Sequence, residues 1–258
     1  PLRQGLARSL NNVTVRLLPE IAGAPGTNKL WELDPAARKI KEMASNMGID
    51  MSNTKAFPSI ALGTAEVSLL ELTSAYTTFV NSGVHIEPIA ITRIEDKEGN
   101  ILQEFHPNYT KEVISAETAY IMTDMLRGVV RGGEGYHGTG VRLRNTYNVR
   151  QDVAGKTGTT NNASDNWFIG MMPHIVMGAW VGGEDLKLRF RDVSWSIGQG
   201  ARSALPIVGQ FINYATADPN AYWKYDAFTP PPGFVPPEDP NENDSEMLKD
   251  ENKGNIGW

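Results

Sequence analysis

"DVAGKTGTTNNASDNWFIG", residues 152–170, contains a lysine between glycines, a row of threonines and an apolar run that starts at a tryptophan. An ammonium group beside hydroxyls can hold a carboxylate through charge-assisted hydrogen bonds. A glycine in an extended segment lets a second chain approach the backbone closely. The segment therefore predicts a strand edge on which a peptide with a free carboxylate can lie as an added strand. The N–H of Thr159 can supply one half of an oxyanion hole there.

Extended and helical patterns surround this segment. Three extended segments linked by short polar or proline-containing turns, at 151–159, 166–172 and 175–181, predict an antiparallel meander. Residues 89–94 and 101–105 predict a hairpin around the polar turn 96–100. Helical spacing of apolar residues predicts helices before and after the meander, at 2–18, from Asp34 to Gly48, from Ser68 to Gly83, from Ser115 to Gly132 and over 203–216. This order of elements predicts an α+β layer fold.

Several helix ends have specific capping signals. Asp34 is expected to be an N-cap because Pro35 follows it at the first helical position. Ser68 and Glu71 have the spacing of a capping box, and Ser115 is the predicted start of the next helix.

The net charge of −6 is concentrated at the C-terminal end. Residues 229–258 carry seven acids against two lysines, so residues 1–228 are close to neutral. A neutral body gives no electrostatic reason to expect a nucleic-acid partner. We expect a domain over 1–228 and a proline-rich acidic tail over 229–258 that has too few apolar residues to form a core.

Metal and cofactor sites are not expected. The chain has no cysteine, and its four histidines are scattered without metal-ligand spacing. No apolar run approaches the roughly 18 residues that a bilayer-spanning helix needs.

Four stretches resemble the transpeptidase domain of class A penicillin-binding proteins, in that family's order over about residues 1–216. They are "ARSLNNVTVRL", "PSIALGTAEVSLLELTSAYTTFVNSG", "VAGKTGTTNNASDNWFIG" and "GQGARSALPI". The preference for class A rests on Leu10 and on "GTAEVSLLELTSAY". The resemblance implies a serine β-lactamase/D,D-transpeptidase-like fold, an antiparallel sheet flanked by helices. It also implies that the N-terminal strands and the nucleophile's helix lie outside this chain.

The family carries three signatures: Ser-x-x-Lys with the nucleophile, Ser-x-Asn, and Lys-Thr-Gly. Residues 9–11 look like the second signature and residues 156–158 match the third. The resemblance implies that Ser9 and Lys156 are catalytic and pass a proton to the leaving group. The implied substrate-binding residues are Asn11, Thr157, Gly158 and Thr159.

The first signature is expected in a companion segment, either a preceding part of the same polypeptide or a cleaved fragment. Ser52 and Lys55 fit Ser-x-x-Lys literally, but they follow a helix end at Gly48 and precede Pro58, so we interpret them as a loop. Ser164-Asp165-Asn166 resembles a second signature but lies in the turn after the Lys-Thr-Gly strand. We therefore expect the Ser9 hydroxyl within hydrogen-bond reach of the Lys156 ammonium, with Asn11 facing the same cleft.

The implied activity is a peptidoglycan D,D-transpeptidase, an acyltransferase that acts on D-Ala-D-Ala stem peptides through a serine acyl-enzyme and is trapped by β-lactam antibiotics. The implied location is the periplasmic side of the inner membrane, with an anchor preceding this chain. Two alternatives stay open. One is a β-lactamase or D,D-carboxypeptidase, which would use water for deacylation. The other is a non-catalytic module that binds or scaffolds the cell wall.

Overall fold

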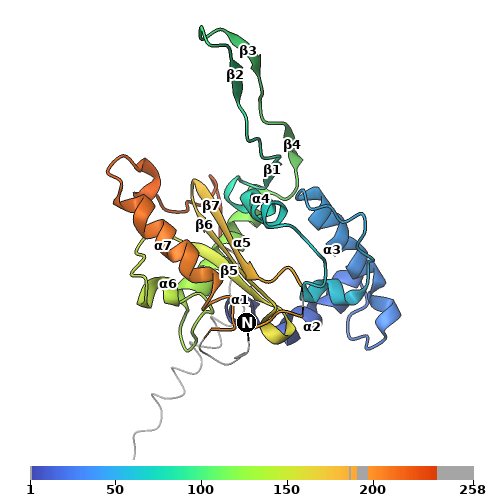
Figure 1. Ribbon diagram of the computed structural model, residues 1–258. Helices are drawn as coiled ribbons and strands as arrows, with labels where there is room; N and C mark the ends of the chain where they lie inside the picture. The colour runs from blue at the N-terminus through green and yellow to red at the C-terminus, as the bar shows by residue number, and fades with distance from the viewer. Residues whose placement is uncertain (1, 186, 191–196, 237–258) are drawn as a thin grey trace, which may run out of the picture.

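The computed structural model describes residues 2–185, 187–190 and 197–236 (Figure 1). The α-helices are α1 Leu2–Ala7, α2 Asn11–Ala22, α3 Asp34–Asn46, α4 Leu69–Val80, α5 Ala116–Arg131, α6 Arg142–Asn145 and α7 Ala204–Ala217. The strands are β1 Val84–Ile86, β2 Arg93–Glu95, β3 Ile101–Glu104, β4 Tyr109–Glu112, β5 Ala154–Thr159, β6 Asp165–Met172 and β7 Ile175–Gly182. Short 3₁₀ turns span Leu30–Leu33, Pro58–Leu62, Asn161–Ala163 and Tyr222–Tyr225.

The predicted meander is confirmed as a three-stranded antiparallel sheet in the order β5-β6-β7. Lys156 pairs with Ile169, and Thr157 pairs with Phe168. Among the strands of the described residues, β5 and β7 each have one hydrogen-bonded neighbour. The strand that carries the Lys-Thr-Gly sequence is therefore an edge of the sheet.

Helices cover both faces of this sheet (Figure 1). α7 packs on β6 and β7, and Phe168 and Met172 lie in the fully buried cluster that includes Leu205 and Ile212 of α7. α4 and α5 pack on the opposite face, where Met171 joins Leu126 and Val129 of α5. Because successive residues of a strand point to opposite faces, both faces of β6 are apolar, and this strand lies at the centre of the protein.

The prediction of a single helix over residues 2–18 is wrong. The helix is interrupted at Ser9, between α1 and α2. Ser9 has a φ of 55°, in the left-handed region. α2 then folds back on α1, so closely that a Cβ on Gly5 would lie 2.7 Å from Cγ1 of Val13. The apolar spacing is satisfied by either arrangement, and the break is fixed by this tertiary contact.

The capping predictions had mixed outcomes. The capping box of Ser68 and Glu71 is confirmed at the start of α4, and the Ser115 side chain caps α5 by accepting from the Thr118 N–H. The prediction for Asp34 is wrong: Leu33 occupies the N-cap position, and Asp34 is the first residue inside α3. An acid in the first turn still interacts favourably with the helix dipole, so the same residue fits either position.

A long two-stranded arm projects from the body (Figure 1). The predicted hairpin is confirmed in β2 and β3, although its first strand begins at Arg93 and is shorter than predicted. Asp96 organises the turn, since its Oδ1 accepts from the N–H groups of Glu98 and Asn100. The base of the arm, where β1 pairs with β4, was not predicted.

Residues 228–234, near the end of the described chain, contact α5 and Asp152, which lies just before β5. The N–H of Phe228 donates to Oδ2 of Asp152 at 3.1 Å, and the Phe234 ring lies edge-on to Tyr120, with centroids 5.1 Å apart. Residues 237–258, including Trp258, are outside the described residues, and the division at residue 228 stays a prediction. Within the described part of the chain, none of the helices has the length and apolar character that crossing a bilayer requires.

Candidate active site

Ser9 and Lys156 meet although 147 positions separate them: the Lys156 ammonium donates to Oγ of Ser9 at 2.8 Å. The predicted contact between these two side chains is therefore present. Ser9 lies at the break between α1 and α2, where its side chain is exposed, and its left-handed backbone conformation is uncommon for a non-glycine residue. Strained backbone of this kind persists where the surrounding structure fixes it and occurs often at functional sites.

Burial makes the Lys156 ammonium easier to deprotonate. Its pKa is lowered from 10.5 to about 8, because loss of solvent disfavours the charged form. The ammonium also donates to the carbonyl oxygen of Thr157 at 2.6 Å. A lysine with a pKa near 8 is mostly protonated at neutral pH, yet it gives up its proton more readily than an ordinary lysine.

Glycines bring β5 close to its neighbour. A Cβ on Gly155 would lie 2.7 Å from the carbonyl oxygen of Ile169, and a Cβ on Gly158 would lie 3.1 Å from Cβ of Trp167. The tight approach fixes the position of Lys156 between the two glycines.

The threonines of β5 make different contacts. Thr157 is buried, and its hydroxyl lies 2.7 Å from that of Thr139. Thr159 is exposed, and its hydroxyl accepts from the N–H of Gly200 at 3.0 Å. Thr139 and Gly200 were not singled out in the sequence.

Asn11 is the first residue of α2, two positions after Ser9, and is exposed. Its direction toward the cleft stays a prediction.

Ser52 and Ser164, the other two serines that match a family signature literally, make contacts away from Lys156. The N–H of Ser52 donates to Oδ1 of Asp50 in a turn after α3, as expected of a loop. The hydroxyl of Ser164 lies 2.9 Å from that of Thr160 and donates to Asp165 at the turn between β5 and β6. Ser9 is therefore the serine that contacts Lys156, as the sequence predicted.

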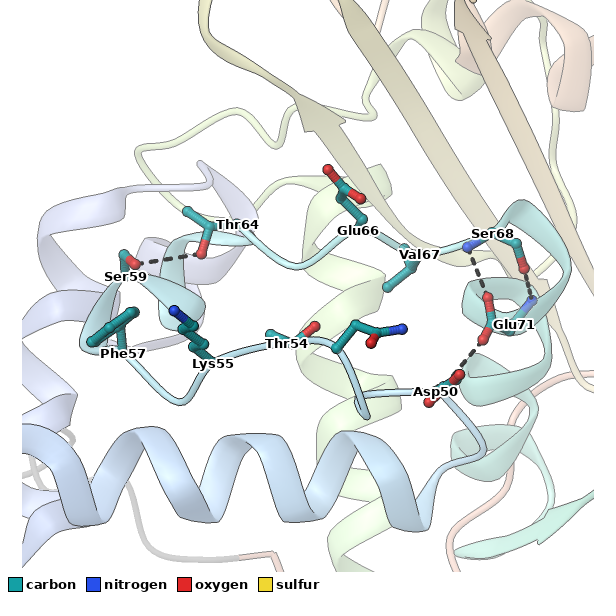
Figure 2. Close-up of a pocket in the computed structure, with 11 residues that line it drawn as sticks. Asp50, Thr54, Lys55, Phe57, Ser59, Thr64, Glu66, Val67, Ser68 and Glu71 are labelled. Carbon is teal, nitrogen blue, oxygen red and sulfur yellow. Dashed lines mark hydrogen bonds between the residues drawn. The ribbon is translucent and has the colours of Figure 1, made fainter.

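A separate hollow of about 690 Å³ lies between the loop after α3 and the start of α4 (Figure 2). The Glu71 carboxylate joins the two segments that line it, because it accepts hydrogen bonds from the N–H groups of Asp50 and Ser68. Lys55 and Phe57 also line it, whereas the six predicted site residues do not. The hollow is open and lies outside the predicted site.

The family described as "Penicillin binding protein transpeptidase domain" matches residues 32–181, more than half of the chain. Penicillin-binding protein 1A of Aquifex aeolicus is 36% identical over 237 residues, which cover 91% of this chain and 28% of that protein. Penicillin-binding protein 1A of Vibrio cholerae is 30% identical over 254 residues, covering 84% of this chain and 29% of that protein. The chain thus spans under a third of the length of these relatives.

A solved structure shares the arrangement of the described elements. Penicillin-Binding Protein 1A from Haemophilus influenzae superposes with a TM-score of 0.70 at 26% identity, covering 89% of this chain and 36% of that one. The α+β transpeptidase fold and the resemblance to class A penicillin-binding proteins are confirmed.

Proposed function

This chain belongs to the penicillin-binding protein transpeptidase domain family, and from that premise we propose that it forms part of a peptidoglycan D,D-transpeptidase. The observation that carries the proposal is the hydrogen bond from Lys156 to Ser9. It joins the Ser-x-Asn and Lys-Thr-Gly signatures, which are far apart in the sequence, at one place.

The proposed reaction is acyl transfer. A serine of the companion segment attacks the carbonyl of the penultimate D-alanine of a stem peptide, while the lysine of the same Ser-x-x-Lys sequence takes the proton of its hydroxyl. The C–N bond to the terminal D-alanine then breaks. Ser9 donates a proton to the departing nitrogen and takes one from Lys156, so that D-alanine leaves as an amine. An amine of a second stem peptide then attacks the acyl-enzyme and forms the new amide, and its proton returns through Ser9 to Lys156. The ester C–O bond breaks, and the released serine takes back its proton from the lysine of Ser-x-x-Lys.

The substrate-binding roles follow from the positions on β5 and α2. The hydroxyls of Thr157 and Thr159 hold the carboxylate of the donor, and Asn11 holds its amide. Gly158 lets the donor lie close against the strand. The N–H of Thr159 and the N–H of the attacking serine stabilise the oxyanion.

The companion segment follows from the sheet and from the comparisons. β7 has one hydrogen-bonded neighbour among the described strands, and an unpaired edge of this kind accepts a further strand. We propose that the nucleophile's helix and the strands that continue the sheet beyond β7 lie in the part of the relatives that this chain does not cover. Similarity to penicillin-binding protein 1A supports a location in the cell envelope, and we propose that a preceding segment anchors the protein in the inner membrane.

Labelling of the full-length protein with a fluorescent penicillin tests this proposal. We expect one stable label per polypeptide and slow release. Ser9→Ala should slow labelling strongly, whereas the matched control Ser164→Ala should label at the rate of the unmodified protein. Rapid turnover of the penicillin would favour the β-lactamase alternative, and no labelling would favour the non-catalytic wall-binding module.

A further inference from the structure

We propose that Thr139 is a positioning residue that holds the two halves of the Ser9–Lys156 site together and orients the Thr157 hydroxyl toward the carboxylate of the donor. This inference rests on the proposed function. Thr139 lies between α5 and α6, outside the three family signatures. Its backbone contacts the end of α1, and its side chain contacts β5.

The backbone of Thr139 is fixed by its two glycine neighbours. A Cβ on Gly138 would lie 2.1 Å from the carbonyl oxygen of Val129, so the turn packs directly on the last residues of α5. The N–H of Gly140 donates to the same carbonyl oxygen at 2.9 Å. Thr139 therefore projects from a rigid support, as a residue must if it is to position others.

From this support Thr139 contacts both halves of the site. Its N–H donates to the carbonyl oxygen of Ala7 at 3.0 Å, and Ala7 is the fully buried last residue of α1, two positions before Ser9. Its hydroxyl lies 2.7 Å from the hydroxyl of Thr157, the residue after Lys156. Thr139 thus sets the separation of α1 and β5 across which Lys156 reaches Ser9.

The direction of the hydroxyl pair matters for substrate binding. Each threonine has one hydroxyl proton and can accept on its oxygen. When Thr139 donates and Thr157 accepts, the proton of Thr157 is available for the carboxylate of the donor. Because Thr157 is buried and its rotamer is restrained by this bond, its hydroxyl is oriented before the donor binds.

Acylation by benzylpenicillin and by its methyl ester tests the role, because the ester lacks the carboxylate charge. The substitution Thr139→Val keeps the N–H and the shape but removes the hydroxyl. In the full-length protein it should slow acylation by benzylpenicillin about fivefold to tenfold, the effect of one lost hydrogen bond, and acylation by the ester less than twofold. Thr139→Ser should stay within about twofold of the unmodified protein for both compounds.

A second comparison separates positioning through Thr157 from a general structural effect. Thr139→Val combined with Thr157→Val should react no more slowly than Thr157→Val alone, within about twofold. Thr216→Val is the matched control, because it removes a partly buried hydroxyl that bonds to the carbonyl oxygen of Ile212 in α7. That control should acylate at the unmodified rate. If Thr139→Val does not fold, Thr139→Ala takes its place as the variant without the hydroxyl, and Thr139→Ser is again the variant that keeps it.

Unchanged benzylpenicillin acylation in Thr139→Val, or equal slowing with both compounds, would overturn the role of Thr139 and leave the proposed function intact. Failure of the unmodified protein to acylate would overturn the proposed function and this inference with it.

Discussion

Replacement of Lys156 by methionine is expected to stabilise the protein while it abolishes the proposed activity. The ammonium is partly buried between Ser9 and the Thr157 carbonyl. Burial lowers its pKa from 10.5 to about 8, so the folded state holds the charged lysine at a cost that the unfolded chain does not have. Methionine keeps the apolar stem without the charge.

The magnitude follows from the pKa shift. A shift from 10.5 to about 8 corresponds to roughly 3 kcal/mol of unfolding free energy. Loss of the hydrogen bonds to Ser9 and Thr157 offsets about 1 kcal/mol of this gain. We therefore expect Lys156→Met to raise the unfolding free energy at pH 7 by about 2 kcal/mol, or the melting temperature by about 4–8 °C.

The pH dependence gives the sign of the effect. Below pH 8 Lys156 is protonated in both the folded and the unfolded protein, so the full cost of burying its charge lowers the stability of the folded state. Between pH 8 and 10.5 the unfolded chain binds the proton that the folded protein has lost, so the stability of the unmodified protein rises with pH. The advantage of Lys156→Met should therefore shrink above pH 8 and be lost near pH 10.5.

Calorimetric melting of the full-length protein between pH 7 and 10 measures this difference, with the exposed Lys55→Met as the control for loss of a lysine. A variant less stable than the unmodified protein at pH 7, or an advantage that does not change with pH, would refute the reasoning.

Three further predictions use other contacts. Ser9→Ala should slow penicillin acylation about 10²–10⁴-fold, measured by stopped-flow labelling, with a melting temperature within about 1 °C of the unmodified protein. Asp152→Asn leaves Arg127 and Arg131 without a buried carboxylate partner and should lower the unfolding free energy by about 3 kcal/mol in denaturant titrations; a change below 0.5 kcal/mol would contradict this. Truncation after Pro236 should leave the melting temperature within about 1 °C, whereas truncation after Thr229 should lower it because the Phe234–Tyr120 contact is lost.

The part of the fold that could be predicted from sequence is the part with local signals. The meander consists of extended segments separated by short polar turns, and Ser68 and Glu71 have the spacing of a capping box. The break at Ser9 had no such signal, because the apolar spacing suits one helix as well as two. It depends on how closely Gly5 meets Val13, which is a tertiary contact.

The site divides in the same way. Lys156 and Ser9 could be paired in advance because both belong to signatures of a recognised family, and their contact was then found. Thr139 carries no sequence signal apart from its flanking glycines. Its importance appears only when folding brings Ala7 and Thr157 to it from opposite sides.

Peptide mapping of the acylated full-length protein tests the central claim most directly. The claim is that this chain supplies the Ser9–Lys156 relay and the substrate-binding strand to a serine of a companion segment. After reaction with a penicillin, mass spectrometry should find the acyl group on one serine outside residues 1–258, in a Ser-x-x-Lys sequence. An acyl group mapped to Ser52, or to any other residue of these 258, would contradict the account.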